Sequence, residues 1–162
     1  MKRLAVLCAP AAAAAVGAVV LLPGAGSAQT GGGQTIKLVE SGNGPFKFID
    51  NPPKATRKRG PSSGDELIFA NKLTDASGKA AGTLLATCTF TPKAGTLLCD
   101  GVFKLASGTI TGTALTSENS LTTTIAITGG TGAYEGARGS VTSVDRSNKD
   151  NSPADDTIHL LG

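Results

Sequence analysis

From residue 65 onward the chain repeats one pattern, in which apolar and polar side chains alternate over short runs. In residues 67–73, Leu67, Phe69, Asn71 and Leu73 share one side, and residues 84–90 and 97–105 repeat the arrangement. Alternation with a period of two indicates strands that bury one face. The 3.6-residue period of an amphipathic helix is missing from this part of the sequence. We therefore expect an all-β protein in which Asn71 is one of the few polar side chains facing inward.

Further strands are expected on similar grounds at residues 35–40, 109–117, 121–128, 139–146 and 157–161, with a short apolar patch at residues 46–49. Gly, Pro, Asp and Ser separate the runs at intervals of about a dozen residues, which is typical of an antiparallel sandwich or barrel. Periodicity alone does not choose between these two architectures.

Residues 1–28 have the pattern of a secretory signal peptide. Lys2 and Arg3 precede an apolar, alanine-rich run at residues 4–22, and small residues at 26–28 come before a cleavage site after Ala28. A membrane anchor is the alternative, since about 18 apolar residues can span a bilayer, but the small residues at the exit favour cleavage. We expect a secreted protein with a flexible leader at residues 29–33 and a single domain at residues 34–162.

The charge balance of the mature chain argues against some classes of partner. The 15 basic residues of the full chain fall to 13 without Lys2 and Arg3, against 12 acidic residues. A nucleic acid or a membrane surface selects a strongly basic field, which this balance does not provide. The chain also has no Trp and only one Tyr on which bases could stack. We expect no nucleic-acid partner, and no membrane attachment after cleavage.

Cys88 and Cys99 are the two cysteines that remain after signal cleavage. A tight turn is expected at residues 92–95, midway between them, and folding about it places the two cysteines opposite each other. A secreted protein favours oxidation, and closing a loop of this length contributes about 3 kcal/mol. A reactive thiol is the alternative, but no neighbouring His, Lys or Arg would lower its pKa. We predict a structural disulfide.

Other side chains with chemical potential are sparse. His159 is the single histidine, so it cannot build a metal site or a catalytic triad by itself. The acidic residues between 145 and 156 lack the glycine and the closing glutamate of a calcium-binding EF-hand loop, and a hydrated loop is expected there. No zinc cluster, Ser-His-Asp set or paired-carboxylate motif has usable spacing. We expect neither a metal nor a cofactor.

The most specific motif is AITGGTGAYEGARG at residues 126–139. A phosphate-binding loop is not expected, because the spacing is not G-x-G-x-x-G and no Gly-Lys-Ser/Thr follows. The motif resembles the A-I-T-G-G-(S/T)-G-x-(F/Y)-E-G-x-x-G segment of allene oxide cyclases and the G-G-T-G-x-F-x-x-A-R-G segment of plant dirigent proteins. Both families share a small β-barrel, which also has a bacterial secreted branch. The resemblance therefore implies an antiparallel β-barrel of about eight strands, from residue 34 to residue 162.

The resemblance to the cyclases extends from residue 64 to about residue 141. Residues 69–73, FANKL, are similar to the cyclase F-x-N-K-L, in which the Asn binds the substrate oxygen through water; this implies such a role for Asn71. The pocket cysteine of the cyclases corresponds to Cys88. Their first-strand catalytic glutamate has no clear counterpart at residues 35–38, and their pocket tyrosine has none, so the cyclase reaction itself is not expected.

The resemblance to dirigent proteins implies a different acid. Residues 46–50, FKFID, resemble the dirigent F-x-F-H-D, whose Asp is a catalytic acid, and Arg138 matches the arginine of A-R-G. An Asp facing an apolar barrel would have a raised pKa and could shuttle protons. The alternative is that Asp50 only starts the following turn and that Arg138 is a solvated or ion-paired residue.

The expected function is therefore a secreted barrel that binds a hydrophobic small molecule and steers its cyclisation or isomerisation. Asp50 would be the acid, with Asn71 and Arg138 as polar orienting groups. The side chains expected to contact the substrate, besides Asn71, are Phe48, Phe69, Phe103 and Tyr134. Two alternatives remain open: a non-catalytic binding or surface module with a filled barrel, and a true dirigent that guides radical coupling by another oxidase. The resemblance also implies a homo-oligomer, a trimer.

Overall fold

The computed structural model describes residues 33–54, 56, 60–147 and 152–162. These residues form nine strands and no α-helix. The strands are β1 (Gln34–Glu40), β2 (Phe46–Ile49), β3 (Glu66–Thr74), β4 (Ala80–Phe90), β5 (Thr96–Leu105), β6 (Gly108–Ser117), β7 (Thr122–Gly132), β8 (Gly139–Asp145) and β9 (Ala154–Leu160). The expected signal peptide at residues 1–28 lies outside the described residues.

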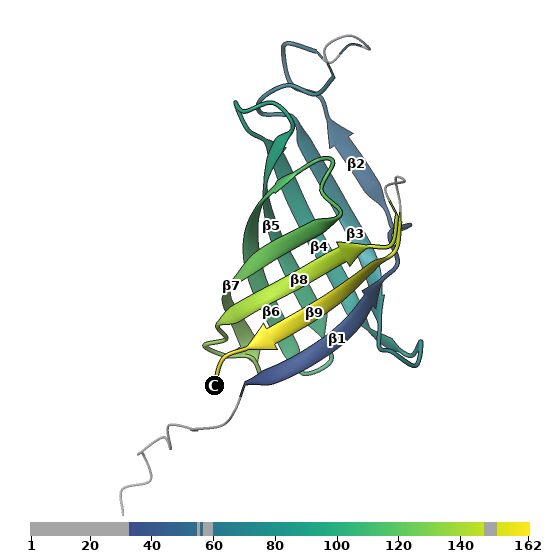
Figure 1. The fold of residues 1–162 in the computed structure, drawn as a ribbon, viewed down its shortest axis with the longest axis vertical. Helices are drawn as coiled ribbons and strands as arrows, with labels where there is room; N and C mark the ends of the chain where they lie inside the picture. Colours follow the sequence, from purple (N-terminus) through teal and green to yellow (C-terminus); the bar gives the residue numbers. More distant parts are fainter. Residues whose placement is uncertain (1–32, 55, 57–59, 148–151) are drawn as a thin grey trace, which may run out of the picture.

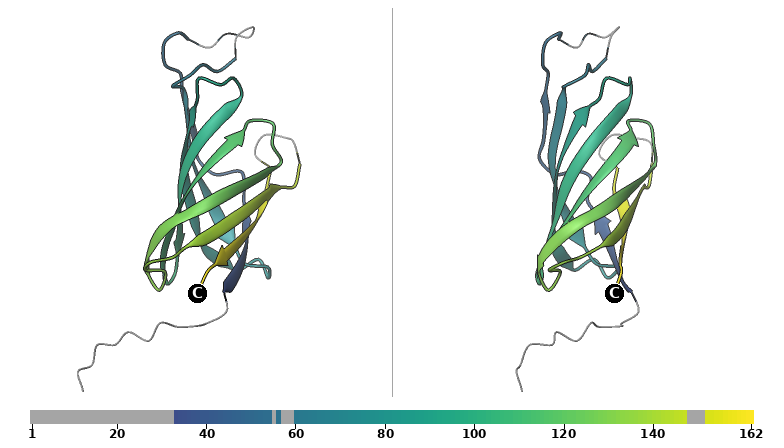
Figure 2. Two further views of the ribbon diagram at one scale, coloured as in Figure 1. Left: turned by 60° about the vertical axis from the view of Figure 1, so that its left-hand side comes forward. Right: turned by 90° about the vertical axis from the view of Figure 1, so that its left-hand side faces the viewer.

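Eight of the strands close into an antiparallel barrel (Figures 1 and 2). Their order is β1-β9-β8-β7-β6-β5-β4-β3, and β3 pairs with β1 to complete the circle. Closure removes the unpaired edges that an open sheet would expose. The predicted barrel is confirmed. The end of the barrel that carries Leu160 and the end of the chain is called the closed end below, and the end that carries β2 is called the open end.

β1 and β2 lie along the same edge of β3 and act as one interrupted strand. β1 meets β3 at Glu40 and Leu73, and β2 meets it at Phe46 and Phe69, so residues 41–45 form a detour between the two strands. Backbone hydrogen bonds continue through the detour, from Ser41 N to Lys72 O (3.0 Å) and from Ala70 N to Pro45 O (3.0 Å). The wall of the barrel therefore stays hydrogen-bonded beside Asn71.

The last strand begins earlier than the sequence pattern indicates. β9 starts at Ala154, whereas a strand was expected only from residue 157. Ala154, Asp156, Ile158 and Leu160 are all buried and alternate with outward residues. The expectation of a hydrated loop is therefore wrong for residues 154–156, which belong to β9. This part of the strand was missed because the inward-facing Asp156 interrupts an otherwise apolar alternation.

The closed half of the barrel is packed solid. One buried cluster fills it, made of Leu38, Leu73, Leu84, Phe103, Ile110, Ile127, Val141, Ile158 and Leu160. A smaller cluster of Cys88, Phe90 and Leu97 packs against Leu67, Phe69 and Cys99 nearer the open end. Most of the core predicted from alternation is thus found inside. Leu121, the first apolar residue of the strand expected at residues 121–128 and expected to face inward, is an exception: it is 46% exposed and precedes β7.

Solvent reaches the two phenylalanines of β2 at the open end of the barrel. Strand pairing places Phe46 opposite Phe69, and Phe48 opposite Leu67, so both phenylalanines face the interior side of the sheet. They nevertheless remain 59% and 36% exposed. Leu67 and Phe69 are themselves only partly buried. β2 pairs with β3 and lies at the end of the strand order, so its second edge is unpaired among the described strands and its two phenylalanines stay in contact with solvent.

Candidate functional site

Three buried polar side chains gather on one wall of the barrel interior. Glu40, Asn71 and Asp156 retain 8%, 7% and 1% exposure, and they come from β1, β3 and β9. These strands are neighbours in the closed order, with β1 between the other two. The set Glu40, Asn71 and Asp156 is called the polar wall below.

Asn71 connects the polar wall to the backbone. Its Nδ2 donates a hydrogen bond to Glu40 Oε1 at 2.5 Å, and its Oδ1 accepts one from Gly44 N at 2.9 Å. The inward orientation predicted for Asn71 is confirmed. Both ends of its amide have partners inside the protein, so Asn71 holds the 41–45 detour in place and also orients the Glu40 carboxyl.

Burial raises the pKa of Glu40 to about 7. The hydrogen bond from Asn71 lowers this pKa, but the negative charges of Asp156 and Asp145 raise it further. Removal from water disfavours the charged form of an acid, which is the dominant cause here. A carboxyl with a pKa near neutrality is present in both protonation states at pH 7, so it can both donate and accept a proton.

Asp156 is the second buried acid, and neither of its carboxyl oxygens has a hydrogen-bond partner in the described part of the chain. Burial raises its pKa to about 6, and the charges of Asp145 and Asp155 raise it further. Ser143 lies opposite it on β8 and partly offsets the rise in pKa, although no bond of hydrogen-bond length forms. An unpartnered buried carboxyl is unfavourable for folding.

Strand pairing brings together two acids that no sequence motif connects. Strand pairing sets Leu38 opposite Asp156 and Glu40 opposite Ala154, so the two acids are diagonal neighbours on the same face. They were missed because they lie at opposite ends of the domain sequence. The signal that could have found them is parity: Glu40 continues the inward series of Ile36 and Leu38.

The opposite wall is apolar. In the closed order β6 and β5 lie across from β1 and β9. The inward residues of β4 to β6 beside the open half are called the apolar wall: Ala86, Cys88, Cys99, Gly101, Gly112 and Ala114. The predicted Cys88–Cys99 disulfide is present, with an S–S distance of 2.03 Å. Its pairing leaves no thiol beside the acids.

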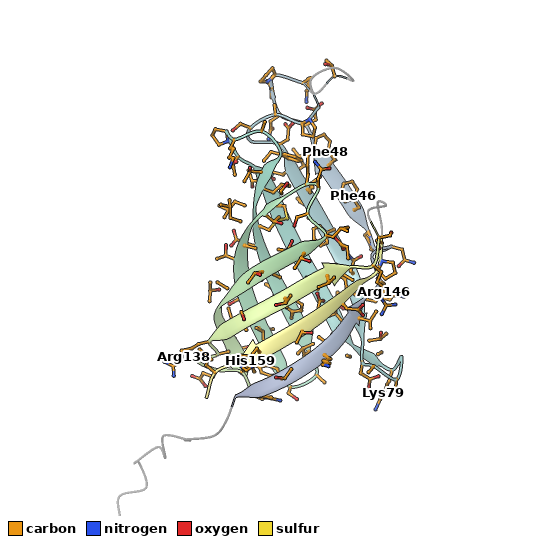
Figure 3. All side chains as sticks on the ribbon, viewed as in Figure 1. Phe46, Phe48, Lys79, Arg138, Arg146 and His159 are labelled. Atoms are coloured by element: carbon orange, nitrogen blue, oxygen red, sulfur yellow. A yellow bond between two sulfur atoms is a disulfide. The ribbon has the colours of Figure 1, made fainter. Side chains whose placement is uncertain are left out.

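The structure separates the residues predicted for catalysis. Asp50 directly follows β2 at the open end, where its backbone oxygen accepts a hydrogen bond from Lys54 Nζ. Arg138 lies at the closed end, far from Phe48, and its guanidinium donates to Gly162 O at 3.5 Å (Figure 3). Asn71 is the predicted site residue that lies with the buried acids. The roles predicted for Asp50 and Arg138 stay predictions, but one small ligand would not contact both.

The predicted substrate contacts are likewise spread along the barrel. Phe48 and Phe69 line the open half, whereas Phe103 is 1% exposed inside the packed cluster of the closed half. Tyr134 lies in the glycine-rich turn at the closed end, beside a hollow of about 340 Å³ that Arg138 and Leu161 also line. A ligand in the open half could therefore contact Phe48 and Phe69, but not Tyr134.

A shallow apolar groove of about 620 Å³ crosses the outside of the barrel. Its floor is the backbone of a paired row that includes Ala86, Gly101 and Gly112, and its walls include Ile68 and Leu85. The outward side chains of Ile68 and Leu85 alternate with the inward ones, so this groove is separated from the polar wall by the sheet.

The described residues contain no group of three or more His, Cys, Asp or Glu suited to holding a metal ion. None of the described segments forms a helix long and apolar enough to cross a bilayer.

Comparison with known proteins defines the family. A family model described as the allene oxide cyclase barrel-like domain matches residues 38–155, and the chain belongs to this family. No curated protein matches the chain significantly in sequence.

Several solved structures share the fold. A pyocyanin demethylase is 26% identical, with a TM-score of 0.61 over 80% of this chain and 99% of that one. An exo-specific intermolecular Diels-Alderase is 17% identical, with a TM-score of 0.59 over 82% of this chain and 100% of that one. The pterocarpan synthase dirigent protein PsPTS1 is 16% identical, with a TM-score of 0.62 over 80% of this chain and 93% of that one.

Proposed function

We propose that this protein is a secreted barrel that binds a hydrophobic small molecule in its open half and steers the cyclisation or isomerisation of that molecule. The observation that carries the proposal is the polar wall: a buried acid, Glu40, is oriented by Asn71 and faces the apolar interior of the barrel.

The two walls would divide the work. The apolar wall would hold a flexible substrate in one conformer and exclude water from it, which removes part of the entropic barrier to ring closure or rearrangement. Glu40 would transfer a proton to the substrate and recover one at a second position, so that no atoms are gained or lost overall. Asn71 acts here as a positioning residue, because it fixes the Glu40 carboxyl and not the substrate.

The comparisons support a small-molecule role. The names of the similar structures denote a demethylase, a Diels-Alderase and a dirigent protein, which act on small molecules within this barrel fold. Secretion is supported by the N-terminal sequence and by the Cys88–Cys99 disulfide, a bond that persists in oxidising surroundings.

Binding in the open half can be tested with the uncharged dye N-phenyl-1-naphthylamine, whose fluorescence rises in apolar surroundings. Ala86→Phe adds a phenyl ring on the inward face of β4, and Thr87→Phe adds the same ring one residue later on the outward face. We expect saturable binding of one dye per barrel, reduced at least tenfold by Ala86→Phe and unchanged by Thr87→Phe.

The same two variants also show whether the dye binds outside the barrel. Thr87 lines the outer groove, so loss of binding in Thr87→Phe with retention in Ala86→Phe would place the dye outside the barrel and contradict the proposal. Thermal unfolding of both variants shows whether each is folded. If Ala86→Phe does not fold, the smaller Ala86→Val replaces it and is expected to give the same order of affinities.

A further inference from the structure

We propose that the ligand of the open half carries a positive charge, and that the cationic group lies between Glu40 and Asp156. The ligand class is a hydrophobic organic cation, such as a quaternised or protonated aromatic amine. This inference rests on the proposed function, since it concerns ligand binding in the same barrel interior and adds the chemical class of the ligand.

The first observation is the unpartnered carboxyl of Asp156. The residue is 1% exposed, and neither carboxyl oxygen has a hydrogen-bond partner among the described residues. It shares the inward face of β9 with Ala154 and Ile158, so it points into the barrel. Buried polar groups in folded proteins nearly always have partners. A donor or a cation supplied by a ligand would provide the missing one.

The second observation is the sign of the buried charge. The buried polar side chains of the described residues are Glu40, Asp65, Asn71 and Asp156, and none of them is basic. Asp65 has its own partners, the backbone N–H groups of Asn51 and Ser62. On the strands of the polar wall, Lys37 and Lys72 are exposed and alternate with the inward residues. Among the residues that the structure describes, no buried basic side chain serves as a counterion to Glu40 and Asp156.

The third observation is geometry. Glu40 and Asp156 lie diagonally across the β1–β9 pair, at a spacing that side chains on adjacent strands can bridge. One cationic group between them would contact both carboxyls. Asp145, which is exposed beside Ala154 on β8, adds a third negative charge on the same side. Attraction between charges is stronger in a desolvated cavity than in water, so a cation would gain more there than on the surface.

The acids give the binding a pH dependence of known sign. The titratable groups that face this position are Glu40 on β1, Asp156 on β9 and Asp145 on β8, while Asn71 on β3 and Ser143 on β8 do not titrate. All three acids have raised pKa values, to about 7 for Glu40 and about 6 for Asp156. A cation requires their ionised forms, so its affinity should rise between pH 5 and pH 8.

The test uses two probes of the same shape, the permanent cation N-methylquinolinium and the uncharged 1-methylnaphthalene. Binding to the full secreted protein is measured by isothermal titration calorimetry at pH 5, 6, 7 and 8. We expect the cation to bind at least tenfold more tightly than the neutral probe at pH 8, and this ratio to shrink below pH 6. The affinity of the neutral probe should change little with pH.

Two variants with the same change of charge locate the effect. Asp156→Asn should reduce the affinity of the cation at pH 8 about tenfold and leave that of 1-methylnaphthalene unchanged. Asp100→Asn, on the exposed outer face of β5, should leave both affinities unchanged. If Asp156→Asn does not fold, Glu40→Gln is the second variant, and it should lower the affinity of the cation in the same direction.

The outcomes separate this inference from the proposed function. Equal affinities for the two probes would overturn the cationic ligand and leave apolar binding in the barrel intact. Equal losses in Asp156→Asn and Asp100→Asn would also overturn it, because the attraction would then not depend on the buried acid. Failure of both probes to bind, up to the solubility limit of the neutral one, would count against the proposed function as well.

Discussion

At the scale of single residues, the carboxyl groups of this protein fall into two kinds with opposite behaviour. Asp65, Asp75 and Asp155 accept hydrogen bonds from neighbouring donors, which lower the pKa of each. Glu40 and Asp156 are buried in the barrel, and burial raises the pKa of both. In the first kind, the hydrogen bonds favour the charged carboxylate. The second kind destabilises the fold at neutral pH, which is typical of a site kept for a ligand or a reaction.

Glu40→Gln should therefore change how stability depends on pH. The pKa of Glu40 is about 7 in the folded protein against 4.5 for the unperturbed group, so the folded state binds more protons between these values. Stability should fall as pH rises from about 4.5 to about 7, and Glu40→Gln should remove this part of the fall. At pH 8 we expect the variant to be more stable than the parent by up to about 3 kcal/mol.

The measurement is chemical denaturation of the parent and the variant from pH 4 to pH 8. Glu135→Gln, in an exposed turn, removes the same charge without the burial and serves as the control. Parallel curves for the parent and Glu40→Gln would show that the Glu40 carboxyl is not the group that titrates on unfolding.

At the scale of the element, the β6–β7 pair shows where the barrel tolerates no extra atom. The pairing shifts register between Thr111 and Gly112, and a Cβ at Gly112 would lie 2.6 Å from Ile125 Cγ2 and 2.9 Å from Ala126 O. Its register partner Gly101 has more room, since a Cβ there would meet its nearest atoms at 3.5 Å. Gly101 therefore leaves space for a methyl group, and Gly112 does not.

Gly112→Ala should lower the free energy of unfolding by about 1–3 kcal/mol, because Ile125 or the β7 backbone must move. Gly101→Ala should change it by less than about 0.5 kcal/mol, since the added methyl group reaches only ordinary contact distance. Urea denaturation of the two variants side by side measures the difference. Equal losses would mean that the register shift at Gly112 does not bring Ile125 as close as described.

The β4–β5 hairpin is the element that the disulfide stabilises. Cys88 and Cys99 are register partners separated by 11 positions, so the bond closes a short loop in the unfolded chain. The double replacement Cys88→Ser, Cys99→Ser should lower stability by about 2–5 kcal/mol. Thiol titration of the unfolded, unreduced parent should find no free thiol from this pair. Two titratable thiols would show that the bond does not form in the folded protein.

At the scale of the whole molecule, the outer surface carries apolar side chains that the barrel itself does not bury. Leu85, Leu98 and Leu115 are 48%, 47% and 69% exposed, and Leu98 pairs directly with Leu115 across β5 and β6. Together with Ile68, they border the outer groove or continue its face. Contiguous exposed apolar surface of this kind often marks an association site.

The homo-oligomer implied by the sequence resemblance stays a prediction, and this face is where it can be tested. The double replacement Leu98→Lys, Leu115→Lys should shift sedimentation from oligomer to monomer, because two like charges would be buried at the contact. Thr142→Lys, exposed on β8, is the control and should leave the assembly unchanged. A parent protein that sediments as a monomer at micromolar concentration would contradict the prediction.

Local information in the sequence was sufficient for much of this molecule. The strands of residues 67–73, 84–90 and 97–105 were predictable because alternation depends only on neighbouring positions. The Cys88–Cys99 bond was predictable because one short hairpin sets its register. The inward position of Asn71 followed from the same parity. The choice of a barrel over a sandwich came from the family motif at residues 126–139 and not from the pattern.

Only the tertiary structure decided where the chemistry gathers. Glu40, Asn71 and Asp156 meet because β1 closes the barrel between β9 and β3, a long-range pairing that no local pattern encodes. The same closure sends Asp50 and Arg138 to opposite ends, although each matches a family motif. The pKa of a carboxyl depends on its burial and on charges from distant strands. An aspartate in the sequence therefore looks the same whether it ends on the surface, as Asp155 does, or inside the barrel, as Asp156 does.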